Sequence, residues 1–66
     1  MSSKVGDTLK EARKTAGLTQ KEVAKRAGIH YNHYYRIENN LAEPTVEVVE
    51  KIAKVLNVKS SDIFSF

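Results

Sequence analysis

Residues 17–40, GLTQKEVAKRAGIHYNHYYRIENN, decide the fold of this chain. Thr19 followed by Glu22 is a capping-box pattern, in which two side chains satisfy each other's free backbone N–H groups at a helix start. Gly28 supplies the left-handed residue that commonly ends a helix. The segment therefore predicts a helix over Gln20–Ala27, followed by a short joint and a second helix.

The second helix is expected over residues 31–39 and is entered through His30. At 100° per residue, Tyr34 and Ile37 fall on one side and can face a core. Asn tolerates the left-handed conformation, so Asn40 is the expected stop. The opposite side carries Tyr31, Asn32, Tyr35 and Arg36, with His33 at the border.

Three more helices are expected around this pair. Val5–Ala16 carries an apolar stripe at helical spacing, and Gly17 follows it as a stop. A second stripe covers residues 45–56, ahead of Asn57, and a last short helix covers residues 60–64. No window alternates apolar and polar residues, so we expect no strand. The predicted fold class is all-α, a compact five-helix domain.

Length and composition limit the rest. A chain of 66 residues is one domain, here 1–66, with the helix-turn-helix at about 19–39. It has no cysteine, which excludes disulfides and thiolate sites, and we expect no metal and no cofactor. No apolar run is long enough for a membrane span or a signal segment, so we expect a cytoplasmic protein without a membrane partner.

Positive charge is concentrated in the first half of the chain. Residues 1–36 hold eight Lys/Arg and three Asp/Glu, a balance of +5, whereas residues 37–66 hold three Lys and five Asp/Glu, a balance of −2. A basic half suits a polyanionic partner, although a solvated helix surface explains the charge equally well.

The order of motifs G-L-T-Q, E-x-A, A-G-I, R-I-E, P-T and I-A-x-x-L-x-V resembles the lambda repressor and Cro family of helix-turn-helix regulators, also called the xenobiotic-response-element family. This resemblance covers nearly the whole chain. It implies a lambda-repressor-like fold, binding of a double-stranded DNA operator, and transcriptional regulation, with repression more typical than activation.

The resemblance also implies roles for single residues. Tyr31, Asn32 and Arg36 stand where the family usually touches base edges. Gln20 stands where a glutamine contacts phosphate and braces the recognition helix. The remaining positions that the family places at the DNA backbone or flanking it are His33, Tyr35 and Asn40. Lys21 is expected there as well, from its positive charge and not from the resemblance.

Side-chain chemistry supports base reading on this helix. Asn pairs bidentately with adenine and Arg with guanine. The rings of Tyr31 and Tyr35 can stack on a sugar, touch a thymine methyl or bond a phosphate through the hydroxyl, unless one of them packs against the preceding helix. His30 and His33 lie three residues apart, but no nearby ligand completes a metal site.

Two further expectations concern contacts within and between chains. Arg13 and Glu38 resemble a family ion pair that ties the first helix to the end of the third; the alternative is an exposed pair of little energetic value. The protein is expected to be a homodimer on a palindromic site. Val48, Phe64 and Phe66 are the candidate interface residues, although Phe64 alternatively closes the core.

Two other functions, that of an antitoxin and that of an enzyme, fit this sequence less well. An antitoxin would grip a protein through the same exposed face and bind DNA only secondarily, but antitoxins usually add a segment for the toxin. An enzyme is not expected, since no Ser, His and carboxylate fall at triad-like spacings.

Overall fold

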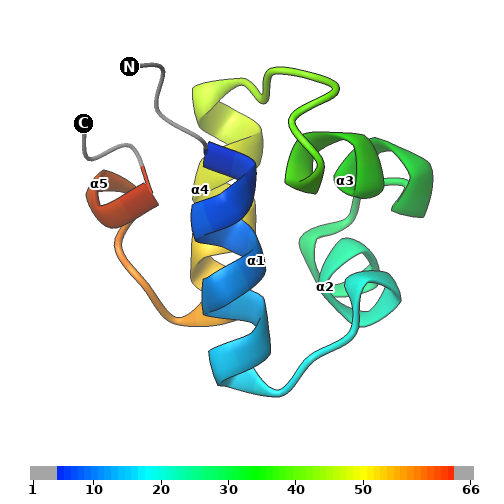
Figure 1. Ribbon diagram of the computed structural model, residues 1–66. Coiled ribbons are helices and arrows are strands. Elements are labelled where there is room, and N and C mark those ends of the chain that lie inside the picture. The colour runs from blue at the N-terminus through cyan, green and yellow to red at the C-terminus, as the bar shows by residue number, and fades with distance from the viewer. Residues whose placement is uncertain (1–4, 64–66) are drawn as a thin grey trace.

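The structure is a computed structural model that describes residues 5–63 (Figure 1), and all its regular elements are helices. The helices are α1 (Val5–Ala16), α2 (Gln20–Ala27), α3 (Tyr31–Glu38), α4 (Val46–Leu56) and α5 (Ser60–Ile63). The all-α prediction is confirmed, and α1 and α2 have the predicted bounds. No helix in the range 5–63 is long and apolar enough to cross a membrane.

Two helix bounds differ by one residue from the prediction. α3 ends at Glu38 because Asn39 already leaves helical geometry, at φ −95° and ψ 12°. α4 begins at Val46 because Thr45 is its N-cap, with its side chain accepting a hydrogen bond from the backbone N–H of Val48 at 3.2 Å. For the last helix, Phe64 lies outside the described residues.

The first four helices all end in the same way. Each is followed by a residue in the left-handed region: Gly17 and Gly28 (both φ 74°), Asn40 (φ 60°) and Asn57 (φ 59°). After α3, the Asn40 N–H donates to Ile37 O and the Leu41 N–H to Arg36 O, which is the Schellman arrangement. The predicted stops are therefore confirmed, including the two at which Asn replaces the commoner Gly.

The helices form two sides around a central pair. α1 and α4 contact each other, α2 and α3 pack together on one side of them, and α5 lies on the other side (Figure 1). This arrangement holds α3 at the edge of the molecule, far from α5.

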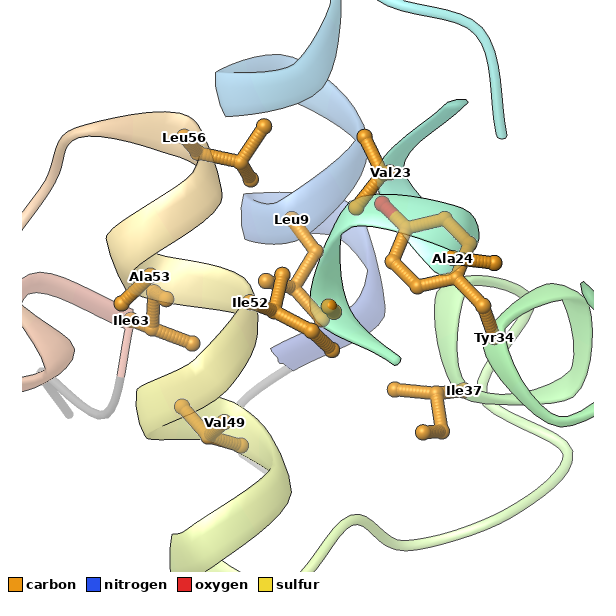
Figure 2. Packing of buried hydrophobic residues seen from close by; sticks show 11 residues of the cluster. Leu9, Val23, Ala24, Tyr34, Ile37, Val49, Ile52, Ala53, Leu56 and Ile63 are labelled. Atoms are coloured by element: carbon orange, nitrogen blue, oxygen red, sulfur yellow. The ribbon is translucent and has the colours of Figure 1, made fainter. Parts of the chain in front are cut away.

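The core lies where all five helices meet (Figure 2). Its centre is formed by fully buried aliphatic side chains, and the ring of Tyr34 extends from α3 into the same cluster. The cluster comprises Leu9, Val23, Ala24, Ala27, Tyr34, Ile37, Val49, Ile52, Ala53, Leu56 and Ile63.

Candidate nucleic-acid interface

α3 has two chemically distinct sides. The buried side consists of Tyr34, Ile37 and Glu38, which are at most 1% exposed. The exposed side is called here the recognition face and consists of Tyr31, Asn32, His33, Tyr35 and Arg36. α3 has eight residues and is about 12 Å long. An α-helix with its side chains is about 10–12 Å in diameter, so it fits the major groove of B-DNA, which is about 12 Å wide.

A buried carboxylate fixes the end of α3 to the two preceding helices. Arg13 of α1 holds Glu38 with both prongs of its guanidinium, Nε to Oε2 at 2.8 Å and Nη2 to Oε1 at 3.1 Å. Gln20 of α2 donates from Nε2 to the same Oε1 at 2.8 Å. The expected ion pair is therefore present, and Gln20 braces α3 as expected, with Glu38 as its partner.

This network explains how a carboxylate can remain charged in the core. Burial alone would raise the pKa of Glu38, but hydrogen bonds led by the one from Arg13 outweigh it, so the pKa lies below its usual value. The hydroxyl of Tyr34 is also buried beside this network, but it makes no hydrogen bond of good geometry within residues 5–63. Burial, followed by the close approach and the negative charge of the Glu38 carboxylate, raises the pKa of Tyr34.

Gln20 also reaches the start of α3. Its Oε1 accepts a long hydrogen bond, 3.5 Å, from the hydroxyl of Tyr31. The ammonium of Lys21 lies 5.7 Å from the centroid of the Tyr31 ring, within cation–π range. Tyr31 thus leans toward α2 but remains 42% exposed.

The N-terminus of α1 is clamped against the end of α3. Gly6 is buried, and its N–H donates to Oδ1 of Asn40 at 3.1 Å, while Nδ2 of Asn40 donates to Asp7 at 3.1 Å. A β-carbon on Gly6 would lie 2.5 Å from the carbonyl oxygen of Ile37 and closer still to that of Glu38. Sequence reasoning missed this clamp, because a glycine inside a helical stripe gives no local sign of a partner 34 positions away.

The same clamp bears on the role expected of Asn40. Its backbone N–H closes the turn to Ile37, and its side chain contacts α1. A phosphate contact at Asn40 stays a prediction, and these internal bonds compete with it.

The remaining predicted residues are scattered over the molecule. His30 precedes α3 as its N-cap without a side-chain capping bond, and it is exposed. Val48 is half-buried and packs against the core cluster, so it offers only part of its side chain to a partner. Phe64 and Phe66 lie outside the described residues.

Positive charge extends from α3 onto α2. Lys21, Lys25 and Arg26 are exposed on α2, and Arg36 is exposed on α3. The recognition face therefore has hydrogen-bonding groups for bases and neighbouring cations for phosphates.

Comparison with known proteins places this arrangement in a family. A helix-turn-helix family model matches residues 9–63. An uncharacterised helix-turn-helix transcriptional regulator of Archaeoglobus fulgidus is 38% identical over 58 residues, 88% of this chain and 82% of that protein. The antitoxin PezA of Streptococcus pneumoniae is 37% identical over 59 residues, covering 89% of this chain but 37% of PezA.

A solved structure agrees with the sequence matches. The crystal structure of SinR, described as the master regulator for biofilm formation, in complex with DNA superimposes with a TM-score of 0.88 at 31% identity. The superposition covers 92% of this chain and 98% of that one. With its fold, its two-sided α3 and these relatives, the chain belongs to the helix-turn-helix family of transcriptional regulators.

Proposed function

We propose that this protein binds a specific double-stranded DNA operator and represses transcription from it, with α3 in the major groove. Asn32 and Arg36 read base edges together with Tyr31, and Gln20, Lys21, His33 and Tyr35 contact or flank the DNA backbone. The protein acts in the cytoplasm, associated with the nucleoid, and we propose no enzymatic reaction for it.

The observation that carries this proposal is that α3 has separate buried and exposed sets of side chains. The side chains of α3 that are buried against the rest of the protein are Tyr34, Ile37 and Glu38. The five side chains of the recognition face remain exposed, and Tyr31 among them also contacts Gln20 and Lys21 of α2. Among them, Asn32 and Arg36 have the two-pronged hydrogen-bonding groups suited to adenine and guanine.

Selection from random duplex DNA tests the proposal directly. The wild-type protein should enrich one sequence motif over several rounds, and a variant carrying Asn32→Ala and Arg36→Ala should not enrich the same motif. These residues are exposed, so the variant should keep the wild-type melting temperature. Failure of the folded wild-type protein to enrich any motif would contradict the proposal.

Salt dependence provides a second, independent test. Each phosphate neutralised by the protein contributes about −0.9 to the slope of log K against log salt concentration. Lys21→Ala should make the slope shallower by about one such unit. Lys54→Ala is the matched control, because Lys54 lies in the hollow beside Val58 and Ser60, next to α5 and away from α3. Equal slopes for both variants would show that Lys21 contacts no phosphate.

The similarity to PezA raises a second candidate function, an antitoxin-type module that binds a protein. The match covers little more than a third of PezA, so it supports a shared helix-turn-helix and not a shared toxin-binding segment. In that case the recognition face would serve a protein partner. The DNA selection above separates the two functions, because a protein-binding module would enrich no motif strongly.

A further inference from the structure

The two exposed tyrosines of α3 stand together beside the residues proposed to read bases. Tyr31 and Tyr35 are four positions apart, so they lie on the same side of the helix. Their ring centroids are 6.3 Å apart with a tilt of 44°, and they are 42% and 41% exposed. We call this feature the tyrosine pair.

The contacts of Tyr31 limit what the pair can offer to a ligand. Its hydroxyl donates toward Gln20 on α2, and the ammonium of Lys21 lies over its ring. The hydroxyl of Tyr31 and one face of its ring are therefore engaged with α2, and the rest of the ring remains exposed. The exposed part of the Tyr31 ring is held in place by these contacts. It presents an apolar surface within a face that is otherwise polar and basic.

The DNA major groove offers one apolar group to such a surface. Adenine, guanine and cytosine present only hydrogen-bonding groups there, whereas thymine adds its C5 methyl. 5-Methylcytosine carries the same methyl group. From the geometry of the tyrosine pair, together with the proposed placement of α3 in the groove, we infer that Tyr31 and Tyr35 recognise the C5 methyl of a thymine next to the bases read by Asn32 and Arg36. This inference rests on the proposed function.

The test removes only the methyl group. In the selected site, each thymine on either strand is replaced in turn by deoxyuridine, and the dissociation constant is measured by fluorescence anisotropy. Burial of one methyl group predicts that the wild-type protein binds about three- to fivefold more weakly at one or two positions in each half-site. The variant that lacks the ring covering this methyl, either Tyr31→Ala or Tyr35→Ala, should bind the thymine and deoxyuridine sites with equal affinity.

Phe variants separate ring contact from hydroxyl contact. Tyr35→Phe should retain the deoxyuridine effect, and Lys54→Ala should behave as wild type at every position. If Tyr35→Phe weakens binding as much as Tyr35→Ala and deoxyuridine has no effect, the hydroxyl bonds a phosphate and the inference is wrong. Melting temperatures verify that each variant is folded.

A final comparison identifies the source of the methyl group. Cytosine and 5-methylcytosine are placed in turn at each pyrimidine of the site. Weaker binding with deoxyuridine identifies thymine as the source. If deoxyuridine has no effect but the protein binds 5-methylcytosine more tightly than cytosine, the source is methylated cytosine. Tight binding of the selected site with neither effect overturns methyl recognition while leaving DNA binding intact. Absence of any selected site would overturn both the inference and the proposed function.

Discussion

At the scale of single residues, one carboxylate has an outsized structural role. Glu38 is fully buried and joins α3 to Arg13 of α1 and to Gln20 of α2. An ion pair at the surface would contribute less than about 1 kcal/mol. A buried carboxylate differs because removing either partner leaves a charge or a donor unsatisfied in the core.

We therefore predict that Glu38→Ala lowers the free energy of unfolding by about 3 kcal/mol. That is a large share of the roughly 3–10 kcal/mol expected for a domain of this size. Chemical unfolding of Arg13→Ala, Glu38→Ala and the double variant measures the coupling, which should exceed about 1 kcal/mol. Small and additive effects would show that the pair contributes little.

The lowered pKa of Glu38 predicts how stability depends on pH. In the folded state this carboxyl holds its proton less tightly than in the unfolded chain, where its pKa is near 4.5. Its contribution to stability is therefore complete above that value and is lost as pH falls from about 4.5 through the lower folded pKa. Unfolding measured from pH 7 to pH 3 should show this loss, and Glu38→Gln should reduce it. An unchanged acid profile in Glu38→Gln would contradict the assignment.

Arg36 is predicted to act on specificity and not on stability. Arg36→Ala should weaken binding to the best site by about 1–3 kcal/mol and relax the preference at one base pair. Asn32→Ala should do the same at another. Binding measured against a panel of single-base variants tests this. A uniform loss on all sequences would mean that these residues hold phosphate.

At the scale of the elements, the helix ends were the most predictable feature. Thr19 and Glu22 form the expected capping box, with the Thr19 N–H 2.9 Å and the Glu22 N–H 3.1 Å from their acceptors. Caps and left-handed stops depend on residues within one turn of each other, so the sequence contains all the information needed. This locality is why the four left-handed residues that follow α1 to α4 were correctly predicted.

Contacts between helices were less predictable. The Arg13–Glu38 pair was expected from the family resemblance and not from spacing. The brace from Gln20 was expected from the same resemblance, but its partner Glu38 was not named, and the Gly6–Asn40 clamp was missed, because each contact joins residues 18 or more positions apart. Such contacts depend on how the helices pack, which no local pattern in a single sequence specifies.

Asn40 and Asn57 allow the clamp to be separated from the helix stop. Both have φ near 60°, but only the side chain of Asn40 accepts the Gly6 N–H. Asn57→Gly should stabilise the protein by up to about 1 kcal/mol, because Gly adopts the left-handed region without strain. Asn40→Gly should instead destabilise it by about 1–3 kcal/mol, because a buried N–H loses its acceptor. Thermal unfolding of both variants measures the contrast, and equal shifts would refute the role of the clamp.

At the scale of the whole molecule, size constrains the DNA complex. The described chain measures 30 × 22 × 20 Å, and one such domain reads only a few base pairs. Two copies in contact can place their α3 helices about one helical turn apart, roughly 34 Å. Outside α3, the exposed large apolar side chains among the described residues include Leu41 and Val46, close in sequence to Val48.

We predict that two copies bind one palindromic site, with half-sites centred about one helical turn apart. Sedimentation of the protein with selected DNA should give two protein chains per duplex, and removal of Phe66 should weaken dimerisation. Disrupting one half-site provides the control, since it should lower affinity much more than a change outside both half-sites. One chain bound to a site without symmetry would contradict the prediction.

The two-sided character of α3 has a consequence for how such a protein can diversify. The buried residues of α3 and its exposed residues are different side chains, and apart from the contacts of Tyr31 with α2, mutation can alter the exposed set while leaving the buried set untouched. Duplicated copies of the gene can therefore drift to new target sites without passing through unfolded intermediates. For the same reason, the five side chains of the recognition face form a natural unit for redesign, in which the DNA specificity changes while the fold stays the same.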